Sequence, residues 1–284
     1  MGLTKGALYI VATPIGNLSD ITYRAVEVLK DVDVIAAEDT RHSRRLLQHY
    51  GVEKPLVAFH EHNERKVADT LIRRLSAGES IAIISDAGTP LISDPGFSLV
   101  RIARKEGIAV KPVPGPCALV AALSVSGLAT DHFVFEGFPP RTSMARRTYF
   151  GRALEYFGTL IYYEACHRIE ACLSDMQIVF PGERHITIAR ELTKTYETVV
   201  SVTLGNVLEV FNDPYMRKGE FVVLLQGREV SDRSEPLKEH EEKLLAALLD
   251  ECSLKSAVNI ATKVHGLRKK TVYDAALRMV EERG

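Results

Sequence analysis

The stretch SIAIISDAGTPLISDPG, residues 80–96, joins an apolar run to a long loop of small, acidic and turn-forming residues. The run Ser80–Ser85 is continuous and apolar, which is typical of a strand buried on both faces of a sheet. The loop from Asp86 to Gly96 is longer than the usual strand-to-helix connection of about 2–6 residues. Asp, Gly and Pro also form ordinary turns, so the loop by itself leaves a structural and a functional role open.

Similar apolar runs flank this stretch and alternate with helical patterns. The helices are expected after a cap at Ser19-Asp20 and around Leu46, Leu71 and Val100. The other predicted strands of this part are 7–12, 32–37, 55–60 and 110–113. Strand and helix alternating in this way predict a mostly parallel sheet with helices on both faces, over residues 1–115.

The sequence pattern changes after Pro114-Gly115-Pro116, where the predicted strands become rich in aromatic residues. A second α/β domain is expected over residues 116–230. Its strands are predicted at 132–138, 159–163, 186–189, 198–203 and 220–225, with more hairpin-like spacing towards the end. A polar linker follows around residues 227–236. Residues 231–284 then show only helical patterns and predict a small helical appendage. Its basic last helices are also compatible with a helix-turn-helix reader of RNA.

Composition excludes several classes of protein. The chain has 284 residues, 36 Lys plus Arg against 37 Asp plus Glu, and 46% hydrophobic residues, which is the balance of a globular protein of about two domains. Its net charge of −1 provides no overall attraction to nucleic acid, so binding to RNA needs local basic clusters. Four cysteines without regular spacing indicate neither a zinc site nor a disulfide framework. We expect a cytoplasmic protein without a signal peptide or a membrane span.

Ligands of open parallel sheets lie beyond the carboxyl ends of the strands, so the five loops there are the candidate site. The first loop lacks a GxGxxG fingerprint and no GxxxxGK[ST] motif occurs, which argues against NAD, FAD and a phosphate-cradling loop. His60 and His62 have no third ligand at suitable spacing, so no metal is expected. The loops are 13–17, 38–42, 60–64, 86–90 and 114–118.

These loops closely resemble those of a bacterial family of methyltransferases that act on small-subunit ribosomal RNA, within the tetrapyrrole methylase superfamily. The resemblance runs in order from about Ala7 to Gly227 and is least clear in the helical tail. The residues that carry it are TPIGNL (13–18), EDTR (38–41), SDAGTPLISDPG (85–96), PGP (114–116) and RELTK (190–194).

The resemblance implies two α/β domains with S-adenosylmethionine in the cleft between them, and a homodimer. It implies methyl transfer to the ribose 2′-oxygen of a decoding-region cytidine in 16S rRNA of the small ribosomal subunit. Carried over residue by residue, the cofactor contacts fall on Ile15, Asp86, Ala87, Gly88, Cys117, Ala118, Glu164, Leu192, Glu220 and Phe221.

A ribose hydroxyl is a poor nucleophile and needs a hydrogen-bond acceptor or base. The candidates at strand ends are Asp39 and Glu191, with Lys194 as an orienting or charge-balancing group. A purely structural reading stays open, in which Asp39 caps a helix and Glu191 pairs with Arg190 or Lys194.

Two local basic clusters are the candidate RNA surface, although a solvated helix face explains such charges equally well. They consist of Arg41, Arg44 and Arg45, and of Arg141, Arg146, Arg147 and Arg152. The alternatives to an RNA methyltransferase are a tetrapyrrole-type small-molecule methyltransferase, to which the second cluster would be of little use, and a non-catalytic ribosome-assembly binder. No DNA or membrane partner is expected.

Overall fold

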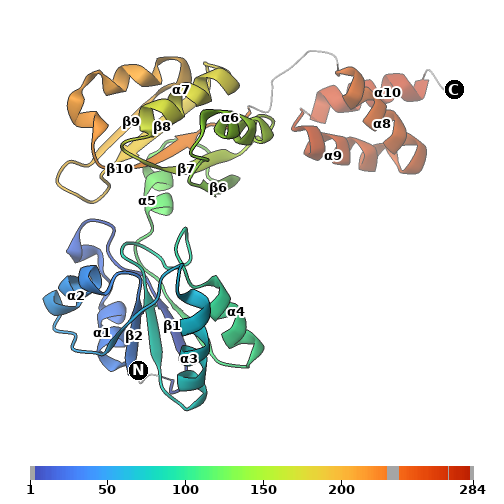
Figure 1. Cartoon of the computed structure of the whole chain (residues 1–284). Coiled ribbons are helices and arrows are strands. Elements are labelled where there is room, and N and C mark those ends of the chain that lie inside the picture. The colour runs from blue at the N-terminus through green and yellow to red at the C-terminus, as the bar shows by residue number, and fades with distance from the viewer. Residues whose placement is uncertain (1–3, 229–236, 268, 282–284) are drawn as a thin grey trace.

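The computed structural model describes residues 4–228, 237–267 and 269–281 and folds them into two sheets and a helical bundle (Figure 1). The first sheet has the strand order β3-β2-β4-β1-β5, and all of its strands are parallel. Its strands are β1 (Leu8–Val11), β2 (Val34–Ala37), β3 (Leu56–Ala58), β4 (Ile81–Ile84) and β5 (Val110–Val113). The parallel sheet expected from the alternating pattern is therefore confirmed.

Helices cover both faces of this sheet. Ala25, Val28 and Leu29 of α1 pack on one face together with Leu47 of α2. The other face is covered by Leu71 and neighbouring apolar residues of α3 and α4. The helices are α1 (Tyr23–Asp31), α2 (Thr40–His49), α3 (Glu64–Ser76) and α4 (Phe97–Lys105). Because β2 and β4 are apolar and buried at every position, they can only be placed between two helical layers.

The first helix begins later than predicted. Ser19-Asp20 lies in a short 3-10 helix, η1 (Leu18–Asp20), whose cap is Asn17. The N-cap of α1 is Thr22, whose hydroxyl accepts a hydrogen bond from the backbone N–H of Ala25 at 3.1 Å. Both positions offer a capping side chain, and the sequence pattern could not distinguish between them.

The second sheet has the order β6-β7-β10-β8-β9 and is mixed. Strands β6 and β7 are parallel, whereas β10 runs antiparallel to β7 and β8, and β9 antiparallel to β8. The strands are β6 (Phe133–Gly137), β7 (Thr159–Ala165), β8 (His185–Arg190), β9 (Thr198–Thr203) and β10 (Glu220–Leu225). The hairpin-like spacing of the last strands thus reflects antiparallel pairing.

One face of the second sheet packs against α6, α7 and η2, and the other against α5. The face with α5 also contacts Ile15 from the first domain, and α5 lies between the two sheets (Figure 1). The helical elements are α5 (Ala118–Val125), α6 (Ser143–Arg152), α7 (Ile169–Val179), η2 (Leu204–Asn212) and η3 (Pro214–Arg217).

Three helices form a separate bundle at the C-terminal end (Figure 1). They are α8 (Glu239–Glu251), α9 (Leu254–His265) and α10 (Lys269–Glu281), and they enclose a core of their own around Leu245, Val258 and Val272. We propose residues 1–115, 116–230 and 231–284 as the domain limits. Among the described residues, no helix is long and apolar enough to span a membrane.

Candidate cofactor and substrate site

A cavity of about 430 Å³ lies between the two α/β domains. The first domain contributes the loops that follow β1, β2, β4 and β5, at the carboxyl ends of its strands. The second domain contributes parts of β7, β8 and β10 and the residue Leu192 just after β8. A cavity of this volume is in the range of small-molecule and cofactor sites, and its position is the one that parallel sheets favour.

All ten residues that the sequence analysis assigned to the cofactor line this cavity. The first domain and the start of α5 supply Ile15, Asp86, Ala87, Gly88, Cys117 and Ala118, and the second sheet supplies Glu164, Leu192, Glu220 and Phe221. The structure therefore brings together residues that are up to about 200 positions apart in the sequence. Their direct contact with a cofactor stays a proposal.

Backbone pairing between two loops shapes the floor of the cavity. Thr13 and Gly88 exchange hydrogen bonds of 2.9 and 3.0 Å between their backbone N–H and carbonyl groups. Gly88 adopts a φ of 83°, a conformation that L residues with a side chain rarely adopt. A Cβ at this position would lie 3.3 Å from Cγ2 of Ile15. Glycine thus lets the backbone line the cavity directly.

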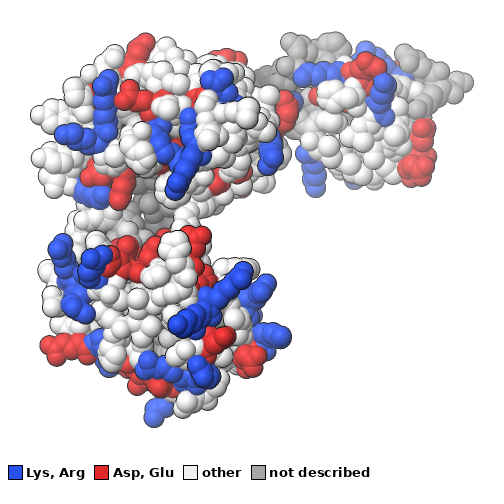
Figure 2. Space-filling view, viewed as in Figure 1, with Lys and Arg blue, Asp and Glu red and all other residues white. Residues whose placement is uncertain are grey.

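Carboxylates make one wall of the cavity acidic. Burial raises the pKa of Glu38, and the nearby charge of Asp86 adds to the effect. Burial likewise raises the pKa of Asp94 to about 6; a hydrogen bond from Ser85 opposes the shift, and the charges of Glu38 and Asp86 reinforce it. Figure 2 shows acidic side chains on the edge of the first domain that faces the second. A ligand with a positive charge would relieve this repulsion.

The predicted catalytic residues Glu191 and Lys194 lie together at the edge of the cavity. The Lys194 ammonium donates hydrogen bonds of 2.9 Å to Oε1 of Glu191 and to Oε2 of the cavity residue Glu220. Burial acts to raise the pKa of Glu191, but the hydrogen bonds from Lys194 and from the backbone N–H of Glu220 outweigh it and lower the pKa. Glu191 is therefore a carboxylate held in place, as the structural interpretation also predicts.

Contacts between loops of different domains position this ion-pair network. The backbone N–H of Asn17 donates to Oγ1 of Thr193 at 3.1 Å. A Cβ on Gly16 would overlap the Lys194 side chain, so the first loop approaches the loop after β8 closely. Glu191 and Thr193 both have positive φ values, 50° and 65°, which marks a tightly constrained loop.

The third predicted catalytic residue, Asp39, is the N-cap of α2. Its Oδ1 accepts hydrogen bonds from the backbone N–H groups of Arg41 at 2.8 Å and His42 at 3.4 Å. The first of these bonds is the main reason that the pKa of Asp39 is lowered. Its own N–H donates to Oδ1 of Asp86 at 3.0 Å, which links α2 to the cavity wall. The carboxylate of Asp39 does not line the cavity among the described residues.

All arginines of the first basic cluster are exposed, whereas the second cluster contains one buried arginine. Arg41, Arg44 and Arg45 lie exposed on α2, and Figure 2 shows basic side chains on that side of the first domain. Arg141, Arg147 and Arg152 are exposed as well. Arg146 is only 3% exposed, and its guanidinium lies 2.6 Å from Oδ2 of Asp175. The prediction that Arg146 belongs to an RNA surface is therefore wrong, because its charge is neutralised inside the domain.

Several cavity residues were not identified from the sequence. Glu38 and Asp94 belong to the quoted loop motifs, but sequence alone gave no sign of their burial. Tyr163, Ala165, Ala189 and Val222 lie on strands, where the apolar pattern reports burial but not a neighbouring cavity.

A second hollow adjoins the cavity and shares Phe138 and Ala165 with it. Arg141, His167 and Arg168 also line it. The Arg168 guanidinium pairs with the buried Glu164 at 3.0 Å, whereas Arg141 is exposed and offers a positive charge beside the acidic cavity wall. The side chain of Phe138 is 55% exposed there. An anionic chain with stacking bases would find complementary groups at this hollow.

The comparisons with known proteins agree with this geometry. Residues 7–208 match the family of Tetrapyrrole (Corrin/Porphyrin) Methylases, and residues 235–279 match the RsmI C-terminal HTH domain. The protein named ribosomal RNA small subunit methyltransferase I of Haemophilus influenzae is 49% identical, and the alignment covers 98% of both chains. Its namesake from Pseudomonas aeruginosa is 50% identical over 97% of this chain and 98% of its own.

Solved structures share the fold at low sequence identity. The methyltransferase CobJ has a TM-score of 0.59 at 16% identity, covering 81% of this chain and 97% of its own. A uroporphyrin-III-C-methyltransferase from Thermus thermophilus has a TM-score of 0.54 at 19% identity, covering 78% of this chain and 94% of its own. The fold and the cavity thus define a tetrapyrrole methylase-type protein of two α/β domains. Within that class, the chain belongs to the family of ribosomal RNA small subunit methyltransferase I.

Proposed function

We propose that this chain is an S-adenosylmethionine-dependent methyltransferase that methylates the ribose 2′-oxygen of a cytidine in the 16S rRNA of the small ribosomal subunit. The relatives that match almost the full chain carry the name of that enzyme class. The observation that carries the cofactor assignment is the acidic cavity between the domains, which gathers every residue assigned to the cofactor.

The residues present fit this cofactor. When bound, it supplies a methyl group on a positively charged sulfonium. The carboxylates of Glu38, Asp86 and Asp94 offset a positive charge, and Ile15, Leu192 and Phe221 offer apolar surface to a base. The backbone at Gly88 can approach a ligand closely because no side chain intervenes.

The residues of the chain contribute mainly by positioning and by proton transfer. The reacting oxygen must be held within about 3 Å of the methyl carbon and in line with the bond that breaks. We propose that Glu191 and Lys194 orient the ribose, since their ion pair fixes both side chains beside Glu220. Asp94 lines the cavity and burial raises its pKa to about 6, so we propose that it accepts the hydroxyl proton. Asp39 holds α2 and Asp86 in place.

The substrate and assembly assignments extend this proposal. The exposed Arg141 and Phe138 at the adjoining hollow support an RNA chain that reaches the cavity from this side. A homodimer is supported by exposed apolar residues near the cleft: Val120 and Val125 of α5 are each more than half exposed, and Phe133 lies on the edge strand β6. We place the enzyme in the cytoplasm, where ribosomal subunits are its substrate.

The deciding experiment is transfer of labelled methyl groups from S-adenosylmethionine to small ribosomal subunits from cells that lack this protein. Label at the ribose of a decoding-region cytidine is the expected result. Absence of incorporation, with cofactor binding retained in calorimetry, would overturn the RNA substrate and favour a small-molecule methyltransferase of the same fold.

Substitution of Glu191 by glutamine is expected to lower the single-turnover rate at least about tenfold while the affinity for the cofactor is kept. The amide keeps the shape of the side chain but weakens its bond to the Lys194 ammonium. The matched variant is Asp39→Asn, in which the amide oxygen can still cap α2, and its effect should be smaller. Equal rates in Glu191→Gln and wild type would contradict the orienting role.

The pH dependence of methyl transfer should report the titration of Asp94. Its pKa of about 6 means that the carboxyl is protonated, and unable to accept a proton, below that pH. The value of kcat/KM for the cofactor, which reports groups of the free enzyme, should therefore rise with pH through about 6 and level off above it. Asp94→Asn should be slow and should lack this rise. A pH profile that Asp94→Asn shares with the wild type would exclude Asp94 as the base.

A further inference from the structure

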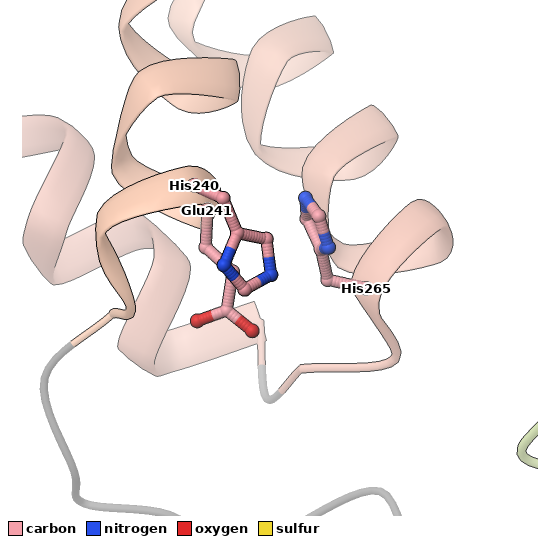
Figure 3. Close-up of side chains that lie close together, drawn as sticks. All are labelled: His240, Glu241 and His265. Atoms are coloured by element: carbon pink, nitrogen blue, oxygen red, sulfur yellow. The ribbon is translucent and has the colours of Figure 1, made fainter. Parts of the chain in front are cut away.

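Three potential metal ligands meet in the helical bundle, far from the cavity between the α/β domains. His240 and Glu241 lie in the first turn of α8, and His265 is the last residue of α9. The two helices follow each other through a short connection, so the start of α8 lies beside the end of α9. One ligand atom from each side chain lies within 4.8 Å of the other two (Figure 3).

The local contacts hold these side chains toward one another. Glu241 is only 3% exposed, and its Oε2 accepts a hydrogen bond of 2.7 Å from the backbone N–H of Lys238. That bond fixes the carboxylate, so Oε1 is the oxygen available to a ligand. The imidazole rings of His240 and His265 are in edge contact, with centroids 5.6 Å apart.

One atom of the cluster lacks a partner that a folded protein normally provides. Nε2 of His265 is buried and has no hydrogen-bond partner among the described residues. Buried polar atoms are nearly always satisfied, and an ion bound between His265, Glu241 and His240 would satisfy this one. A metal ion would bind this nitrogen in its unprotonated form.

We propose that His240, Glu241 and His265 bind a divalent transition metal ion of the zinc class. Two imidazoles and one carboxylate are a ligand set that Zn²⁺ uses, at distances of about 2.0–2.2 Å. Such distances need the three ligand atoms to move somewhat closer together than 4.8 Å, and His240 is exposed and can turn toward the other two. Three protein ligands leave a fourth position for water or an external group.

The ion would connect two helix ends at the junction with the second α/β domain. Arg228, just after β10, donates a hydrogen bond of 3.1 Å to the backbone carbonyl of His265 and pairs with Glu155. Glu155 balances the charge of Arg228, so this guanidinium repels a bound cation less than an unpaired guanidinium would. Metal binding would therefore stabilise the bundle where it meets the rest of the chain.

The test uses the full-length protein, stripped of metal with a chelator and titrated with ZnCl₂ in a calorimeter. Saturable binding of one ion per chain is expected, and Co²⁺ should give the intense visible absorption of a four-coordinate site. His240→Ala and Glu241→Gln should each weaken the affinity at least about tenfold. Glutamine can still accept the hydrogen bond from Lys238, and circular dichroism verifies that both variants keep their helices.

The matched control is His62→Ala. His62 belongs to another pair of neighbouring histidines: its ring centroid lies 6.0 Å from that of His60. His62 is exposed, like His240. This variant should bind Zn²⁺ with unchanged affinity. Loss of binding in His62→Ala, unchanged affinity in His240→Ala, or absence of saturable binding in the wild type would each overturn the proposal. None of these results depends on methyltransferase activity.

Discussion

Substitution of Gly88 by valine is expected to weaken binding of S-adenosylmethionine at least about a hundredfold, which corresponds to about 2.7 kcal/mol. A β-branched residue is strongly disfavoured at the φ of 83° that Gly88 adopts. Its Cβ would lie 3.3 Å from Cγ2 of Ile15, and the added methyl groups would occupy space at the floor of the cavity. The backbone pairing between Thr13 and Gly88 would be disturbed as well. Calorimetry with the cofactor measures the loss.

Gly107→Val is the control that separates backbone strain from loss of the site. Gly107 also has a positive φ, 72°, but a Cβ there would meet no heavy atom within 4 Å. Both substitutions should lower the free energy of unfolding by about 1–2 kcal/mol through strain. Only Gly88→Val should also lose the cofactor. Equal affinity for the cofactor in the two variants would contradict the placement of Gly88 at the binding site.

Arg146→Gln should lower the free energy of unfolding by about 3–5 kcal/mol, the usual range for breaking a buried ion pair. The Arg146 side chain is 4% exposed and donates to Oδ2 of Asp175, with further hydrogen bonds to backbone carbonyls such as that of Ala171. Glutamine is too short to keep all of these hydrogen bonds, and it removes the buried charge beside Oδ2 of Asp175, while Ser143 and Arg147 still donate to Oδ1. Urea unfolding, monitored by circular dichroism, measures the change.

Arg147→Gln provides the comparison. Arg147 also donates to Asp175, at 2.7 Å, but its side chain is 46% exposed, so its loss should lower the free energy of unfolding by about 1 kcal/mol at most. Equal losses of stability in the two variants would contradict the larger contribution expected of the buried ion pair.

The pH dependence of the free energy of unfolding gives a second measure of the ion pair between Arg146 and Asp175. Burial acts to raise the pKa of Asp175, but hydrogen bonds from Arg147, Ser143 and Arg146 outweigh it and lower the pKa. A lowered carboxyl pKa contributes stability above its ordinary value of 3.8, and this contribution is lost as the pH falls toward the folded-state pKa. The wild type should therefore lose more stability on acidification than Arg146→Gln does.

Much of the first domain could be predicted because β1, β2 and β4 are apolar without interruption. Residues 81–84, for example, are all buried, and such a run can only be placed between two layers of helices. The family resemblance assigned residues to a cofactor that the structure gathers around one cavity. Those of the first domain meet there because parallel strands bring their carboxyl ends to one edge of the sheet. The start of α1 was misplaced because Ser19-Asp20 and Thr22 both offer capping side chains within a few residues.

The roles of the charged residues could not be predicted in this way. Arg146 and Arg147 are neighbours of the same residue type, and only the packing of α6 against α7 buries the first and exposes the second. Glu38 and Asp94 lie in different loops. Burial raises the pKa of both, the charge of Asp86 adds to both shifts, and that of Glu38 adds to the shift of Asp94. His240 and His265 are 25 positions apart and meet because two helices reverse direction between them.

The sequence by itself determined the elements, the parallel first sheet and the family of the chain, because hydrophobic period and loop motifs are local properties of the polypeptide. The tertiary structure decided which charges are buried, which carboxylates repel one another and which side chains share a cavity. These properties depend on distance and on exclusion of water, and both are set only when segments remote in sequence pack together.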